Sequence, residues 1–204
     1  MDMDGQTPWP TTGDTIFAHS PDWHTDAQIE SSAGDWYAYT LGYRRAGDLL
    51  VQQIDQAPSH QELLVYPILF LYRHYLELQM KHITAEGRSL LDKGYSFPTG
   101  HSLNALWSVC CPILEQVFPE STPDDTLVVA QLIAEFHSID PQSITFRYPT
   151  DKNGAISVPP GLRRINLTNL SSIMAKLEAF FGGAATGISV YFDTKHEMEA
   201  FLGP

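Results

Sequence analysis

The sequence has few cationic residues, and this shortage limits the ligands that the protein can bind. It contains 12 lysines and arginines against 24 aspartates and glutamates, which gives a formal charge of −12. Loose binding to phosphate backbones needs many cationic contacts, so the chain is a poor general binder of nucleic acid. A small basic pocket on an acidic body remains compatible with this charge.

Cysteine is almost absent as well. The only two, Cys110 and Cys111, are neighbours in the sequence, and two adjacent thiols do not make a disulfide scaffold. They lie in an apolar run over residues 107–114, which predicts buried thiols; a redox role is the less favoured alternative. Free thiols of this kind suit a reducing, cytoplasmic setting.

Long apolar runs and targeting signals are also missing. The longest apolar run covers residues 63–72, whereas a membrane-spanning helix needs roughly 18 apolar residues or more. The first five residues are acidic and do not resemble a signal peptide. We therefore predict a cytoplasmic protein with no membrane segment.

Familiar catalytic and metal-binding motifs are lacking too. The chain has no P-loop, no Gly-x-Gly-x-x-Gly and no Gly-x-Ser-x-Gly motif, so the common nucleotide-binding and hydrolase folds have no support. His19, Asp22, His24 and Asp26 are metal-ligand residue types, but their spacing matches no structural metal site. The sequence predicts neither a metal nor another cofactor.

Core-forming residues, by contrast, are plentiful. Hydrophobic residues make up 43% of the 204-residue chain and aromatic residues 11%, enough for the core of one domain. Residues 1–27 are rich in Pro, Thr, Asp and Gly and predict an irregular arm before a helical domain over 28–204. We expect Trp9, Phe17 and Trp23 to pin this arm to the body.

The helical domain shows apolar residues at spacings of three and four. This pattern predicts helices over about 28–56, 60–85, 101–118, 124–139 and 168–187. The tail, 188–204, is either an extension of the last helix or an edge strand.

Local signals add detail to this pattern. Ser59 and Glu62 form a capping-box pattern at the start of the second predicted helix, and Pro67 predicts a kink or break inside it. Asn153-Gly154 separates two β-prone runs within 143–162, which predicts a short hairpin. The predicted fold is therefore all-α: an antiparallel helical bundle with a short inserted β-hairpin.

The second predicted helix carries a stripe of charge. Arg73, Glu77 and Lys81 are four residues apart and so share one face. The rest of the helix is apolar on most sides, which is typical of a central helix. Because burying an unpaired charge is costly, the stripe predicts a buried ion network or a polar cleft. A solvated surface stripe is the alternative.

Two histidines are candidate site residues. His74 follows Arg73, and together they offer a proton carrier beside a fixed cation, which phosphodiester cleavage can use. His101 opens the third predicted helix, where it either packs as a helix-start residue or joins the site. Each histidine alone is more typical of an ordinary core or surface position.

Two cations are candidate ligand-binding residues. Lys81 ends the charged stripe, and Arg147 lies where the chain leaves a β-prone run. Arg147 either anchors a carboxylate such as Glu77 or binds an anionic ligand.

Three segments carry a resemblance to a known family. They are the run Leu-Tyr-Arg-His-Tyr-Leu-Glu-Leu-Gln-Met-Lys at 71–81, the run Gly-His-Ser-Leu-Asn-Ala-Leu at 100–106, and Phe-Arg-Tyr-Pro at 146–149. In this order they resemble the central helix, the histidine-led next helix and the Arg-Tyr-Pro segment of HEPN proteins (higher eukaryotes and prokaryotes nucleotide-binding). The resemblance extends over about residues 60–185.

The resemblance implies an antiparallel helical bundle, frequent dimerisation, and roles in RNA cleavage, toxin–antitoxin pairs and phage defence. The resemblance implies that many members cleave RNA with an arginine and a histidine separated by four to six residues. Here Arg73 is followed by His74 and then by His82, which lies roughly on the opposite face of the helix. The standard nuclease motif is therefore absent.

Three hypotheses follow. The leading one is a HEPN-like homodimer of a prokaryotic defence or toxin-type system that binds a protein partner or a nucleotide-like ligand. The second is a metal-independent RNA-cleaving nuclease, in which Arg73 stabilises the developing charge, His74 or His101 moves protons, and Glu77 positions them. The third is a structural subunit whose arm, 1–27, docks on a larger complex.

Overall fold

The computed structural model describes residues 9–29, 36–56, 58–121 and 123–202. The chain divides into an N-terminal unit, residues 1–35, and a helical body, residues 36–204. The described part of the first unit is irregular apart from one 3-10 turn, Trp23–Thr25. The side chains of Trp9 and Phe17 are exposed, and their docking to the body stays a prediction.

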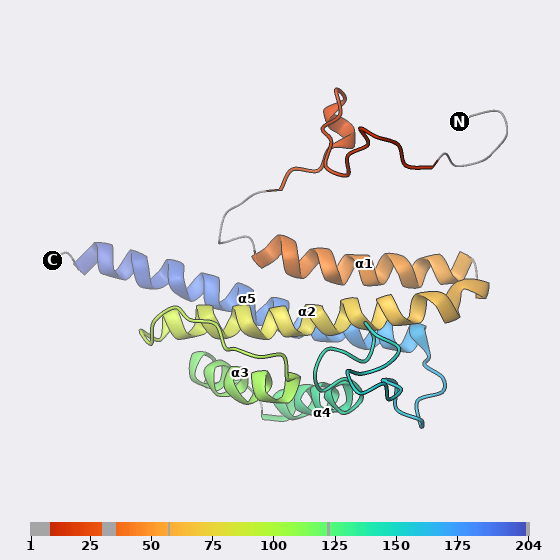
Figure 1. Ribbon diagram of the computed structural model, residues 1–204. Helices are drawn as coiled ribbons and strands as arrows, with labels where there is room; N and C mark the ends of the chain where they lie inside the picture. Colours follow the sequence, from red (N-terminus) through yellow and green to blue (C-terminus); the bar gives the residue numbers. More distant parts are fainter. Residues whose placement is uncertain (1–8, 30–35, 57, 122, 203–204) are drawn as a thin grey trace. The chain divides into compact units, whose positions relative to one another are not determined.

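The body is all-α, as predicted, and its described residues contain five α-helices and no strand. The helices are α1 (Trp36–Gln56), α2 (Gln61–Leu90), α3 (Leu103–Val117), α4 (Pro123–Ile139) and α5 (Leu167–Leu202). α1 and α2 run in opposite directions, whereas α5 returns in the same direction as α2 (Figure 1). The bundle is thus antiparallel within the α1–α2 pair and parallel between α2 and α5.

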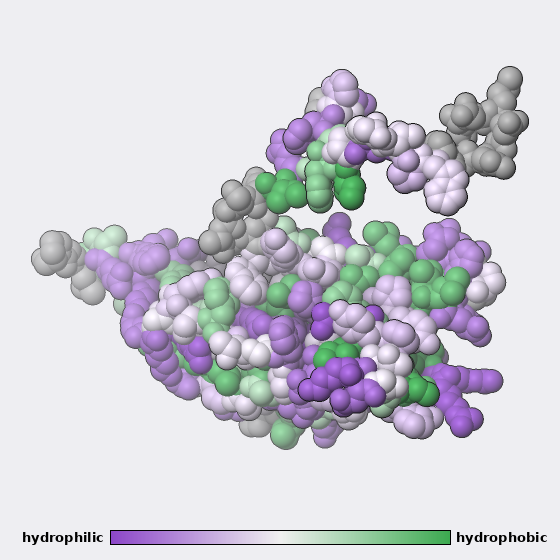
Figure 2. All heavy atoms as spheres, viewed as in Figure 1, coloured by the Kyte–Doolittle hydropathy of each residue, from purple (hydrophilic) through white to green (hydrophobic). Residues whose placement is uncertain are grey.

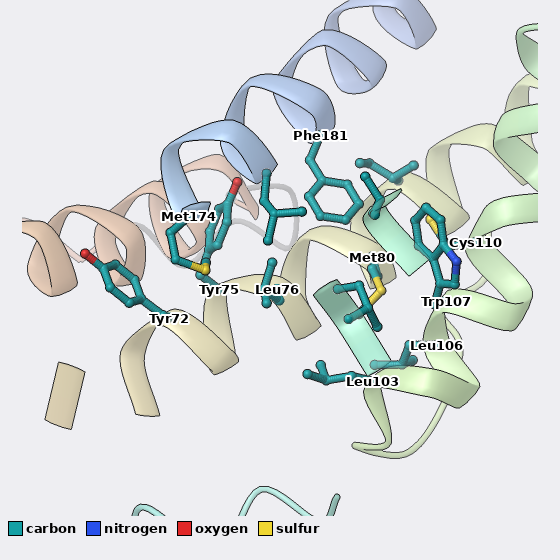
Figure 3. Packing of buried hydrophobic residues seen from close by; sticks show 14 of the residues in the cluster. Tyr72, Tyr75, Leu76, Met80, Leu103, Leu106, Trp107, Cys110, Met174 and Phe181 are labelled. Atoms are coloured by element: carbon teal, nitrogen blue, oxygen red, sulfur yellow. The ribbon is translucent and has the colours of Figure 1, made fainter. Parts of the chain in front are cut away.

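α2 is the central helix, and it packs against α1, α3 and α5. Its Tyr75, Leu76 and Met80 are almost completely buried. Figure 3 shows these side chains meeting Trp107 of α3 and Phe181 of α5 in one core. This position explains why α2 is apolar on most sides, because three helices cover it.

The structure tests two local predictions for α2. The helix is not broken at Pro67 and continues to Leu90, since a proline so close to the start removes a hydrogen bond only from the first turns; a kink at Pro67 stays a prediction. The capping box does not form: Ser59 lies in the 3-10 turn Pro58–His60, and the N-cap, His60, makes no side-chain cap bond.

The predicted β-hairpin is not formed by the described residues. Segment 143–162 has only one isolated antiparallel bridge, between Thr150 and Ile156. The turn does form, because the Asp151 carboxylate accepts the amides of Asn153 and Ala155 at 2.8 and 2.9 Å. The residues before it instead coil, with the amides of Arg147 and Tyr148 both bonded to the carbonyl of Ile144.

α5 is one continuous helix, so the uncertain tail extends it as far as Leu202. By length and composition alone, α5 could cross a membrane. Its mean hydropathy is high enough, although the helix has no long uninterrupted apolar run. Met174, Leu177, Phe181 and Ile188 of this helix are buried in the core of the body. Its last turns extend beyond the other helices (Figure 1).

Candidate functional site

Arg73 lies at the centre of a buried charge network. Its side chain is 0% exposed, and its Nε lies 3.1 Å from Oδ2 of Asp140. One terminal nitrogen donates to Glu77 Oε2 at 2.9 Å, and the other donates to the carbonyl oxygen of His101 at 2.5 Å. All three guanidinium nitrogens are therefore engaged within the protein.

The two carboxylates of the network have further partners. Asp140, 1% exposed, also accepts the backbone amides of Ile144 and Thr145 at 2.8 and 3.1 Å. It therefore holds the start of the α4–α5 connection against the guanidinium of Arg73. Oδ2 of Asp140 therefore contacts Arg73, and Oδ1 binds this turn.

Glu77 connects the buried part of the network to the surface. Its Oε1 lies 2.9 Å from Nζ of Lys81 and 2.8 Å from Nδ1 of His101. Burial raises the pKa of Glu77, but hydrogen bonds from Lys81, His101 and Arg73 outweigh burial, and its pKa is lowered. Glu77 is therefore a carboxylate at neutral pH, as its cationic partners require.

The His101 side chain is 65% exposed. Its Nδ1 is held by Glu77, and Nε2 has no partner in the described part of the chain. His101 stands just before α3, whose N-cap is Ser102, with the Ser102 side chain accepting the amide of Ala105. The start of α3 thus places an oriented imidazole at the edge of the network.

His74 lies apart from these contacts, among aromatic rings. It meets Tyr43 of α1 edge-to-face at 4.4 Å between ring centroids, and it stacks on Phe70 at 5.7 Å. Burial lowers the pKa of His74 below its ordinary value. The imidazole is therefore neutral at pH 7 and acts chiefly as a packed ring.

Arg147 is not a partner of Glu77. Its Nε donates to the carbonyl oxygen of Ser143 at 2.5 Å, and its guanidinium carbon lies 5.9 Å from the ring of Phe70 and 5.7 Å from that of Tyr148. The side chain is exposed. The anchoring alternative for Arg147 fails, and a cation resting on two aromatic rings remains.

These residues define a surface that we call the α2 face. Phe70, His74, Glu77 and Lys81 follow one another along a single stripe of α2. Arg147 covers Phe70, and His101 contacts Glu77. Arg73 and Lys81 together balance the carboxylates of Glu77 and Asp140, so Arg147 leaves this face with one net positive charge. The members of the α2 face are Phe70, His74, Glu77, Lys81, His101, Arg147 and Tyr148.

Sequence reasoning missed Asp140, the second carboxylate of the network. It directly follows the predicted end of α4 and precedes Pro141, a position typical of a helix end rather than of an ion pair. Its only signal was that a buried arginine such as Arg73 needs more than one acceptor.

A second ion network, centred on the buried Arg44, was also missed. Arg44, 3% exposed, pairs with Asp48 and lies 3.3 Å from Glu178. Tyr72 donates to Asp48 at 2.7 Å. This network ties α1 to α2 and α5 and has a structural role. The four-residue spacing of Arg44 and Asp48 was the available signal.

Within the described ranges, no three His, Cys, Asp or Glu side chains lie close enough to hold a metal ion. The surface seen in Figure 2 mixes hydrophilic and hydrophobic residues across the body. Comparison with protein-family models, curated proteins and solved structures finds no match for this chain. The HEPN resemblance therefore stays a prediction that rests on the three sequence segments and their order.

Proposed function

We propose that this chain is a HEPN-like module of a prokaryotic defence or toxin-type system. It binds a nucleotide-like ligand on the α2 face and does not cleave RNA. The observation that carries this proposal is the complete burial of Arg73, with all three guanidinium nitrogens engaged.

A catalytic arginine must present donors to the reacting phosphate. To do so, Arg73 would have to leave Glu77 and Asp140, both at most 2% exposed. Uncompensated buried carboxylates cost several kcal/mol, so this rearrangement is strongly opposed. Arg73 therefore positions Glu77 and Asp140 from the protein interior and is not a phosphate ligand.

Arg147 and Tyr148 are exposed, Phe70 and Lys81 are half-buried, and together they supply the chemistry that a nucleotide needs. The exposed ring of Tyr148 offers a stacking surface for a base, whereas the ring of Phe70 already stacks on His74 and lies against Arg147. Arg147 and Lys81 offer cationic donors for phosphate, and an arginine can bind phosphate through two parallel hydrogen bonds. Ligand binding by Lys81 and Arg147 is the role proposed for them here.

Calorimetric titration of the purified protein with AMP and ATP tests this proposal. We expect saturable binding that weakens about tenfold in Arg147→Met, the change expected for losing one charge-assisted contact. The control is Arg45→Met, an exposed arginine of α1 outside the α2 face, which should bind like the wild type. Absence of binding, or equal binding by Arg147→Met, would contradict the proposal.

The nuclease alternative keeps one supporting observation, the Glu77–His101 pair. A histidine held by a carboxylate at 2.8 Å, with its other nitrogen free, is an arrangement that general acid–base catalysis uses. Incubation of a cellular RNA pool with wild type, His101→Ala and His74→Ala tests it. Cleavage that disappears in His101→Ala would favour the nuclease; no cleavage by the wild type would remove this alternative.

We also propose the homodimer and the protein partner that the resemblance implies. Exposed apolar side chains on α1 support such contacts: Tyr37, Tyr39 and Leu49 are 72%, 61% and 64% exposed. Light scattering after size exclusion should give twice the 22.8 kDa chain mass. A monomer at micromolar concentration would contradict the dimer.

A further inference from the structure

An apolar hollow lies between α4 and α5. Its volume is about 280 Å³. The walls are apolar side chains from both helices and from the connection, among them Phe136, Phe146, Ile173 and Leu177, with Leu69 of α2. An apolar cavity of about 150 Å³ already binds benzene, so a hollow of this size accepts a longer hydrocarbon group.

Arg164 lines this apolar hollow and also a second, more polar one. The second hollow, about 420 Å³, is lined by Arg163 and Arg164 together with Gln61, Glu62 and Val65 of α2. Neither arginine has an ion-pair partner among the described residues. The apolar hollow and the more polar hollow therefore share two lining residues, Arg164 and Ile165.

We infer that these joined hollows bind a single-chain acyl carboxylate of about eight to ten carbons. The hydrocarbon chain fills the apolar hollow, and the carboxylate pairs with Arg164 and Arg163. Charge complementarity selects this ligand class: Arg163 and Arg164 line the more polar hollow against one carboxylate, Glu62, and arginine binds carboxylates through paired hydrogen bonds.

One acidic residue, Glu135 of α4, also lines the apolar hollow. Its carboxylate opposes an anionic headgroup, so its removal should strengthen binding. This gives the inference a test with the opposite sign from removal of Arg164. The inference is independent of nucleotide binding, because none of the lining residues named here belongs to the α2 face.

Calorimetric titration with decanoate, decanol and butanoate tests the inference on the full chain. We expect one decanoate bound per chain and about tenfold weaker binding of decanol, which lacks the charge. Butanoate should not bind, because it cannot fill the apolar hollow. Equal binding of decanoate and decanol would overturn the role of the arginines.

Variants assign the site. Arg164→Ala should weaken decanoate binding about tenfold, Glu135→Gln should strengthen it, and Arg45→Ala should leave it unchanged. Ile173→Trp should fill the apolar hollow and abolish binding. Its unfolding midpoint is measured to show that this variant folds. Unchanged decanoate binding in Arg164→Ala and in a folded Ile173→Trp would overturn the inference. So would binding to phosphatidylglycerol vesicles without binding of free decanoate, because the ligand would then be a membrane lipid.

Discussion

At the scale of single residues, Arg73 has the largest structural role in the charged centre. It joins α2 to the segment before α3 through the carbonyl of His101, and to the end of α4 through Asp140. Its four-residue spacing from Glu77 predicted the pairing, and the apolar surroundings predicted its burial. The partner from α4 was not predictable, since a contact across 67 residues leaves no local pattern.

Replacing Arg73 should therefore destabilise the protein. We expect Arg73→Met to lower the free energy of unfolding by about 3–5 kcal/mol, because it leaves two buried carboxylates without their shared cation. Urea denaturation measures this change. Arg45→Met, at an exposed position of α1, is the control and should change stability by less than about 0.5 kcal/mol. A similarly small loss for Arg73→Met would refute the structural role.

The lowered pKa of Glu77 predicts a pH dependence. In the unfolded chain this carboxyl titrates near its ordinary value of 4.5, and in the fold its pKa lies below that value. The unfolded state therefore binds more protons, and the contribution of Glu77 is complete above about pH 4.5 and is lost as the pH falls through the folded pKa. Thermal unfolding between pH 3 and 7 should show this acid loss, and Glu77→Gln should flatten it. An equally steep loss in Glu77→Gln would assign the effect to other groups.

At the scale of elements, the α1–α2 contact depends on a close approach at Gly47. A Cβ atom built there would lie 2.5 Å from Cε1 of Tyr72, whose ring is completely buried. The sequence places two glycines, Gly42 and Gly47, in this helix. It could not tell which glycine makes the contact.

Two alanine substitutions in α1 separate packing from helix propensity. Gly47→Ala should lower the free energy of unfolding by about 1–3 kcal/mol because the buried ring of Tyr72 must move. Gly42→Ala has nothing within 4 Å of the new Cβ and should raise it by about 0.5–1 kcal/mol. Chemical denaturation of the two variants provides the comparison. Effects of the same sign would contradict the packing of α1 on α2.

Helix positions were the most predictable elements, since periodic apolar residues report the buried face directly. The prediction of a hairpin between α4 and α5 was wrong. Asp140 binds two backbone amides and holds the segment that was expected to be a strand in a turn. The continuation of α5 past residue 187 was undecided because its last turns make few core contacts, so they lack the apolar stripe of a packed helix.

At the scale of the whole molecule, the body carries its own core, which runs through all five helices. We therefore expect residues 36–204 to fold without the N-terminal unit. Far-ultraviolet circular dichroism of this fragment should show the helical spectrum and a cooperative unfolding transition. Loss of cooperativity would show that the body needs residues 1–35 to fold.

The charge of the whole chain and the charge of its candidate site have opposite signs. A chain with a formal charge of −12 repels polyanions at long range, while Lys81 and Arg147 attract a small phosphate at short range. This combination favours a compact nucleotide over a long nucleic acid. Binding of AMP should weaken only modestly with salt, because few phosphate contacts are involved.

The most direct test of the central claim is a titration of AMP into wild type, Arg147→Met and the double variant Arg147→Met, Lys81→Met. The α2 face predicts saturable binding by the wild type, weaker binding by the single variant and no measurable binding by a double variant that still unfolds cooperatively. Wild-type protein that does not bind AMP, or a double variant that binds it equally well, would contradict the assignment of the α2 face as a nucleotide site.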